Sequence, residues 1–308
     1  MKTAFLFSGQ GAQQPGMGKE FYDNFESART VYRIAGDVLG RDIAALCFEG
    51  TQEELNMTHN TQVCMLATDI AAGYVLRDSG IIASGVAGFS LGEYAALVFS
   101  GVLDIKNAFQ IVQIRADAMQ EAVPVGKGGM AAFMGVNGEK AEEICSLVRE
   151  GYVVPANYNS PVQTVVSGDK KGIDHAIKIA ESMGFSAVRL AVSAPFHCGL
   201  MEPAANRVKK ELEKIVFHES QIPLYMNVTG NVEDHLENIP ELLAKQAMSS
   251  VQWVTTLENM RKNGIETFVE CGTGKTLWGL TRKNLKGIQS LRAVDLKTLS
   301  NTIEVLKG

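Results

Sequence analysis

The stretch VAGFSLGEYAALVFSG, at residues 86–101, indicates the class of fold. A short apolar run at residues 81–87 predicts a buried strand, and LGEYAALVFSG predicts a helix directly after Ser90. A serine between two glycines at such a turn fits a nucleophile elbow, in which the hydroxyl projects from a sheet. Because the chain has 30 glycines, Gly-x-Ser-x-Gly also arises by chance. The pattern alone therefore leaves open a nucleophile or a plain tight turn.

The sequence on both sides of this stretch alternates between strand and helix patterns. Apolar runs at residues 3–8, 224–228 and 266–271 predict strands, and helical patterns separate them. Such alternation favours a largely parallel sheet covered by helices on both faces. We therefore predict an α/β fold with a parallel sheet core, in which only helices follow the loop GTGK at residues 272–275.

The middle of the chain has a different pattern. Residues 128–192 predict the order strand, helix, strand, strand, helix, strand, which is the ferredoxin-like βαββαβ arrangement. We expect a small ferredoxin-like subdomain at residues 126–193, inserted into a larger α/β domain formed by residues 1–125 and 194–308.

The composition limits the kinds of partner. With 46% hydrophobic and 20% charged residues, the 308-residue chain can bury a substantial core. Its net charge of -5 comes from acidic and basic residues mixed along the chain, which argues against nucleic acid and membranes as partners. The start MKTAFLFSGQ has too short an apolar run for a signal peptide, so we expect a cytoplasmic protein. Five scattered cysteines without CxxC spacing favour neither a disulfide framework nor a metal site.

A serine nucleophile needs a base within hydrogen-bond reach, most often a histidine. Of the five histidines, His197 has the most suggestive context, because SAPFHCGLM follows a predicted strand and precedes a helix. No acidic residue is an obvious partner for its ring. The helix ending in AKQAMSSVQW offers backbone carbonyls instead, so we predict a Ser-His dyad rather than a triad.

Arg115 is the third residue of interest. It interrupts the apolar face of a predicted helix that also carries Ile111, Val112 and Met119. A guanidinium among apolar groups is unfavourable unless it meets an anion, and its planar fork fits a carboxylate. The residues alone leave two interpretations balanced, a substrate anion or an internal pair with Glu93 or another acid.

Several motifs together resemble a known family. They are GQGAQ at 9–13, GFSLGE at 88–93, Arg115, ANYNSP at 156–161, SAPFHCGLM at 193–201, QW at 252–253 and ECGTGK at 270–275. In this order and at these spacings the chain resembles malonyl-CoA:acyl carrier protein transacylases over essentially its full length. The resemblance implies a large α/β-hydrolase-like domain that carries a ferredoxin-like insertion.

The resemblance also implies a role for individual residues. Ser90 matches the acyl-accepting nucleophile and His197 its base, while Gln246 matches the glutamine whose backbone carbonyl orients that histidine. Gln10 and Leu91 match the two residues whose backbone N–H groups form the oxyanion hole.

Three further residues match the acyl pocket of the family, and one position of this chain departs from the family pattern. Arg115 matches the arginine that binds the free carboxylate of malonate, which favours the anion interpretation. Met119 and Phe196 are expected to contact substrate, and Phe196 resembles the bulky residue with which malonyl-specific relatives crowd out an added methyl group. Phe89 departs from the pattern, because the family usually has histidine there.

The implied activity is transfer of a malonyl group from malonyl-CoA to the phosphopantetheine thiol of an acyl carrier protein. It is expected to proceed by a ping-pong mechanism through a malonyl-serine ester, in fatty-acid biosynthesis, without a metal or a bound redox cofactor. Three alternatives stay open at this point: a trans-acting acyltransferase of a polyketide synthase, a serine acyl hydrolase, and a non-catalytic docking subunit of a synthase.

Overall fold

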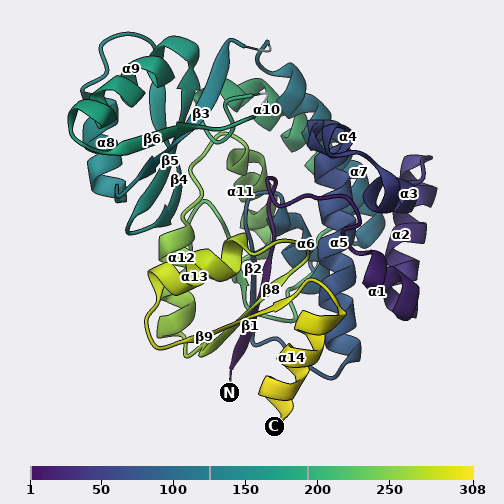
Figure 1. Cartoon of the computed structure of the whole chain (residues 1–308). Helices are drawn as coiled ribbons and strands as arrows, with labels where there is room; N and C mark the ends of the chain where they lie inside the picture. Colours follow the sequence, from purple (N-terminus) through teal and green to yellow (C-terminus); the bar gives the residue numbers. More distant parts are fainter. Residues whose placement is uncertain (1, 125, 193) are drawn as a thin grey trace.

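Two β-sheets, each with its own helices, organise the chain (Figure 1). The structure, a computed structural model, describes residues 2–124, 126–192 and 194–308. The expected α/β fold is confirmed, with a parallel sheet in the larger part and a separate antiparallel sheet in the smaller part.

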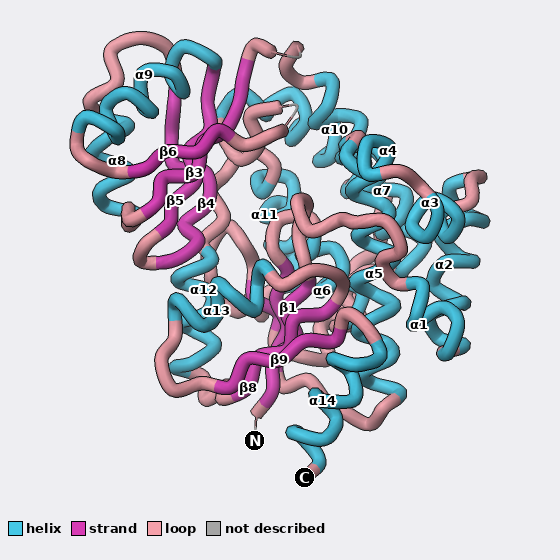
Figure 2. The backbone as a smooth tube through the Cα atoms, in the orientation of Figure 1, coloured by secondary structure: helices cyan, strands magenta, loops and turns pink. Residues whose placement is uncertain are grey.

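The larger sheet has five strands, and every pairing in it is parallel. In spatial order they are β7 (Leu224–Tyr225), β2 (Gly85–Gly88), β1 (Thr3–Phe7), β8 (Thr267–Cys271) and β9 (Gln289–Ala293). The carboxyl ends of parallel strands meet at one edge of the sheet. Figure 2 shows the loops of this edge on the side that faces the smaller sheet.

Helices cover both faces of the larger sheet, as the sequence predicts. Phe5 and Phe7 of β1 pack against α5 (Thr58–Asp78) and α6 (Gly92–Phe99). Ala4 and Leu6 point the other way, against α12 (Trp253–Lys262) and α13 (Thr276–Asn284). The remaining helices of this part are α1 (Lys19–Asn24), α2 (Glu26–Leu39), α3 (Ile43–Glu49), α4 (Gln52–Asn56), α7 (Ile105–Glu121), α10 (Glu202–Leu212), α11 (Ile239–Gln246) and α14 (Leu296–Lys307), with short 3-10 turns at Gly199–Met201 and Leu236–Asn238.

Two expectations for the larger sheet are wrong in detail. The strand expected at residues 224–228 has only two paired residues, because the chain turns at Met226–Gly230, where the Gly230 N–H donates to the Met226 carbonyl at 2.8 Å. The segment after residues 272–275 contains β9 as well as helices. This edge strand pairs on one side only and is partly exposed, so its residues QSLRA lack the continuous apolar run that marks a buried strand.

The smaller sheet confirms the ferredoxin-like order. Its elements are β3 (Gly128–Met134), α8 (Gly138–Ser146), β4 (Val153–Ser160), β5 (Gln163–Asp169), α9 (Lys170–Ser182) and β6 (Ser186–Arg189). The spatial order is β4-β5-β3-β6 with antiparallel pairing throughout. Ala131 and Phe133 pack against α8 and α9, whereas Met130 and Ala132 face α7 and the segment around Phe196. The sheet thus turns its helix-free face toward the larger domain.

The longest helix, α5, spans 21 residues and lies in the core, where most of its side chains are buried. Within the described residues, we find no helix that is both long and apolar enough to cross a membrane.

Candidate active site

Ser90 occupies a sharp turn between β2 and α6. Its backbone has a left-handed φ of 52°. A Cβ added at Gly88 would overlap the backbone of Gly92, and one added at Gly92 would overlap the carbonyl of Phe7. The two glycines therefore allow the turn to pack tightly, and the structure confirms the expected elbow geometry.

His197 lies directly opposite Ser90. The distance from Ser90 Oγ to His197 Nε2 is 2.8 Å, and the His197 N–H donates to the Ala247 carbonyl at 3.0 Å. His197 also has a left-handed φ, of 60°, and within the described residues it shares this feature with Ser90 alone among non-glycine residues. Such backbone strain gathers at functional sites, where the surrounding structure holds it.

Backbone carbonyls hold the imidazole ring. His197 Nδ1 is 2.9 Å from the Gln246 carbonyl oxygen and 3.2 Å from that of Ser249. Since carbonyls only accept hydrogen bonds, the proton lies on Nδ1 and leaves Nε2 free to accept from Ser90. Burial, together with the positive charge of Arg115, lowers the pKa of His197 to about 4. The ring is therefore neutral near pH 7 and able to take a proton.

Gln246 contacts the site through its side chain as well as its carbonyl. Its Nε2 donates to the Ser90 carbonyl and to Glu93 Oε2, both at 2.7 Å. Its Oε1 accepts from Arg115 at 2.9 Å. The sequence analysis assigned a role only to the backbone carbonyl of Gln246. Its side chain also connects Ser90, Glu93 and Arg115 by hydrogen bonds.

Glu93 and Asn227 were not predicted as site residues. Asn227 accepts from the Ser90 N–H at 2.7 Å, donates to the Gly88 carbonyl at 2.6 Å, and its own N–H donates to Glu93 at 2.5 Å. Burial raises the pKa of Glu93 to about 7, although the hydrogen bonds from Asn227 and Gln246 oppose this rise. An acid within the apolar run LGEYAAL was a usable signal for Glu93, whereas Asn227 lies 137 residues from Ser90 and had none.

Arg115 is buried beside the dyad, with 1% of its surface exposed. Its guanidinium donates to Gln62 Oε1 at 2.6 Å, Gln246 Oε1 at 2.9 Å and Ser90 Oγ at 3.2 Å. None of the ion pairs among the described residues includes Arg115, so the internal pair with Glu93 is not formed. A buried cation whose hydrogen-bond acceptors are all neutral is prepared for an anionic ligand.

The backbone N–H groups of Gln10 and Leu91 make no hydrogen bond with any other described residue. The structure brings Gln10 to the pocket wall, and Leu91 follows Ser90 with a fully buried side chain. Both N–H groups are thus available as donors.

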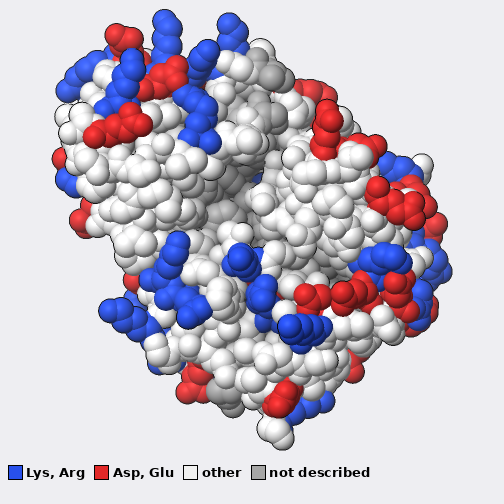
Figure 3. Space-filling view, in the orientation of Figure 1, with Lys and Arg blue, Asp and Glu red and all other residues white. Residues whose placement is uncertain are grey.

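These residues surround a pocket of about 290 Å³ between the two sheets. Met119 and Phe196 both lie in its wall, and Arg115 and His197 are its only titratable lining residues within the described chain. The other lining residues are Gln10, Gly11, Gln62, Phe89, Ser90, Met130, Ala132, Asn157, Asn159, Gln163, Val165, Leu190, Val192, Thr276 and Leu280. Figure 3 shows the surface hollowed between the two parts of the molecule, with mostly uncharged atoms along the hollow.

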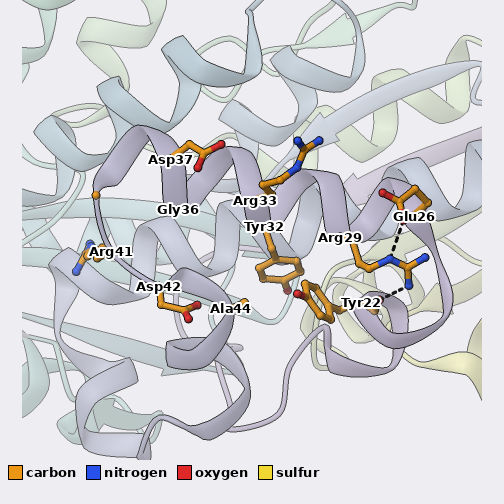
Figure 4. A pocket seen from close by; sticks show the side chains of 11 residues that line it. Tyr22, Glu26, Arg29, Tyr32, Arg33, Gly36, Asp37, Arg41, Asp42 and Ala44 are labelled. Atoms are coloured by element: carbon orange, nitrogen blue, oxygen red, sulfur yellow. Dashed lines mark hydrogen bonds and ion pairs between the residues drawn. The ribbon is translucent and has the colours of Figure 1, made fainter.

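A larger hollow of about 670 Å³ lies elsewhere, against α2 and α3 (Figure 4). Its acids and bases are balanced, and Arg29 already donates to Glu26 at 2.8 Å and to the Tyr22 carbonyl at 3.0 Å. No nucleophile and base meet there, so the smaller pocket is the better candidate site.

A family model described as an acyl transferase domain matches residues 4–296. The chain belongs to this family. It is 39% identical to a malonyl CoA-acyl carrier protein transacylase of Bacillus subtilis, over 99% of this chain and 98% of that one. A solved transacylase of the same name from Clostridium perfringens superposes with a TM-score of 0.97 at 39% identity, covering 100% of this chain and 98% of that one.

Another similar solved structure contains a bound partner protein. It is a malonyl-transacylase in complex with a type II polyketide synthase acyl carrier protein, with a TM-score of 0.96, 37% identity and coverage of 99% and 100%. The resemblance inferred from the motifs is confirmed by these matches.

Proposed function

We propose that the protein transfers the malonyl group of malonyl-CoA to the phosphopantetheine thiol of an acyl carrier protein. The observation that carries the proposal is a Ser90–His197 dyad at 2.8 Å beside a buried guanidinium without a carboxylate partner. It is supported by relatives that carry the name malonyl CoA-acyl carrier protein transacylase and match nearly the full chain.

In the first half of the cycle, Ser90 Oγ attacks the thioester carbonyl of malonyl-CoA and its proton passes to His197 Nε2. The N–H groups of Gln10 and Leu91 stabilise the oxyanion, an effect worth about 3 kcal/mol for one donor. His197 then protonates the departing thiolate of CoA, and the malonyl group stays on Ser90 as an ester.

Arg115 binds the free carboxylate of the malonyl group throughout. Its planar fork fits two carboxylate oxygens, while hydrogen bonds to Gln62 and Gln246 hold the guanidinium in position. Met119 and Phe196 line the space around the acyl chain.

In the second half, the carrier thiol gives its proton to His197 Nε2 and attacks the ester carbonyl. Ser90 Oγ leaves and takes the proton back. The cycle uses no metal and no bound redox cofactor. We assign it to fatty-acid biosynthesis, with a polyketide carrier as the alternative that a solved relative favours. We place the protein in the cytoplasm, where thiols such as its five free cysteines stay reduced.

Intact mass spectrometry tests the proposal. A brief incubation with malonyl-CoA is expected to add one malonyl group to the wild type and none to Ser90→Ala. Addition of acyl carrier protein then moves the group to the carrier. Release as free malonate in the presence of carrier would identify a hydrolase, and absence of any adduct would indicate a docking subunit.

A further inference from the structure

Given the proposed function, the malonyl-Ser90 ester can be attacked by two nucleophiles, the carrier thiol and water. Either one loses a proton to His197 Nε2, forms a bond to the carbonyl carbon and displaces Ser90 Oγ, which takes that proton. The products differ: malonyl thioester with the thiol, and free malonate with water. We infer that Phe89 determines this choice of acceptor, because its ring keeps water away from the ester.

The backbone fixes Phe89 next to the nucleophile. Its N–H donates to the Phe7 carbonyl at 3.0 Å, and its carbonyl accepts from the Gly92 N–H at 3.0 Å. The first bond holds the residue to the end of β1, and the second closes the elbow. Phe89 therefore keeps its position relative to Ser90 through the turn itself.

Packing fixes the ring as well. Its centroid lies 5.3 Å from that of Trp253 in an edge-to-face arrangement with an interplanar angle of 72°. Trp253 is fully buried at the start of α12. On the other side, a Cβ added at Gly9 would lie 3.0 Å from Phe89 Cδ1, so the ring packs against the loop that carries Gln10. The phenyl group thus fills the space between that loop and Trp253.

Phe89 is also part of the pocket wall, together with Gln10 and Ser90. A water held in a protein needs two to four polar partners. A phenyl ring has no donor or acceptor. Phe89, directly before the ester-bearing residue, therefore offers nothing to hold a water, whereas the methylene groups of a pantetheine arm can pack against its ring.

The histidine that the family pattern usually has at this position provides a direct contrast. An imidazole at position 89 would have a ring of comparable size with two polar nitrogens beside the ester. We expect the acyl-enzyme of this protein to be longer-lived in water than that of a variant with histidine there.

The test isolates the malonyl-enzyme by rapid desalting and follows its loss by intact mass, first without thiol and then with pantetheine. For Phe89→His and Phe89→Ala, we expect the half-life without thiol to fall about tenfold, equivalent to about 1.4 kcal/mol in the barrier. Transfer to pantetheine should change less than about threefold, so the ratio of transfer to hydrolysis falls. The matched control is Val166→Ala, which shortens a buried side chain on the face of β5 that packs against α8 and α9, outside the pocket, and should keep the half-life within about twofold.

Three results would overturn the inference. They are unchanged half-lives in both Phe89 variants, equal changes in hydrolysis and transfer, and a half-life in Val166→Ala as short as that in Phe89→Ala. The second would assign Phe89 a merely structural role, and the third would reduce the effect to a general loss of packing. If Phe89→Ala does not fold, Phe89→His decides, because it keeps a planar ring. Failure of the wild type to acquire a malonyl group would instead contradict the proposed function.

Discussion

The two walls of the pocket are built in different ways. On the wall of the larger domain, the side chains that hydrogen-bond to Ser90 all have further partners: they are His197, Arg115, Asn227 and Gln246. On the wall of the smaller sheet, Met130, Ala132 and Val165 contribute apolar surface, and the other lining residues of its strands are uncharged amides: Asn157, Asn159 and Gln163. The difference indicates that one domain sets the positions of the reacting atoms, while the other shapes the space and keeps it free of charge.

The largest effect is expected on the choice between malonyl and acetyl groups, when the positive charge of Arg115 is removed. Acetyl-CoA is smaller than malonyl-CoA and would leave the buried Arg115 unpaired, which is unfavourable by about 3 kcal/mol or more. The wild type should therefore prefer malonyl over acetyl by at least about a hundredfold, since each 1.4 kcal/mol is tenfold. Arg115→Ala should lose malonyl transfer and retain or improve acetyl transfer, as measured by kcat/KM for the two thioesters.

Arg115→Lys is the control, because it keeps the charge and removes the fork. It should recover only part of the malonyl preference. Equal slowing of acetyl and malonyl transfer in Arg115→Ala would show that the guanidinium only supports the fold, and the carboxylate-binding group would then lie elsewhere.

An effect of similar or smaller size is expected from two titrating groups, His197 in the pocket wall and Glu93, which hydrogen-bonds to Gln246 behind it. The pKa of His197 is lowered from 6.5 to about 4, so stability is lost as pH falls between these values. The pKa of Glu93 is raised from 4.5 to about 7, so stability is lost as pH rises between these values. Each contribution is on the order of 3 kcal/mol, and the two oppose one another between about pH 4.5 and 6.5.

Single variants separate the two contributions. Relative to wild type, Glu93→Gln should become more stable as pH rises from about 4.5 to 7, and His197→Ala should become more stable as pH falls from about 6.5 to 4. Urea unfolding at a series of pH values, with each variant compared to wild type, gives these differences. Curves that run parallel to wild type across this range would mean that neither group has a shifted pKa.

The smallest effect is expected on the uncharged wall of the smaller sheet. Met130→Leu conserves volume and should change KM by no more than about tenfold with kcat unaltered, because such swaps are worth less than about 1.5 kcal/mol. Steady-state kinetics with malonyl-CoA measure both constants. A loss of more than about tenfold in kcat alone would mean that the smaller sheet also positions the reacting atoms.

The sequence predicted the residues whose role is tied to a local pattern. Ser90 lies in a glycine-flanked turn, His197 in a loop after a strand, and Arg115 on an apolar helix face. Each pattern spans only a few residues, and the structure brings all three together.

The missed residues act through contacts between distant parts of the chain. Asn227 reaches Ser90 across 137 residues, and Gln62 reaches Arg115 across 53. Amide side chains of this kind look the same in a sequence whether they face solvent or a buried guanidinium. The same limit explains why β9 was missed. It forms a strand because it pairs with β8, whereas its own residues have no clear strand pattern.

The left-handed backbone at Ser90 and His197 lowers the stability of the fold at the two residues that the reaction needs. Glycine adopts this conformation freely, whereas a residue with a side chain is held there at about 1–3 kcal/mol. Selection for stability alone would therefore favour glycine at both positions and would remove the nucleophile and the base together. Serine and histidine at these two strained positions therefore indicate selection for reactivity over stability.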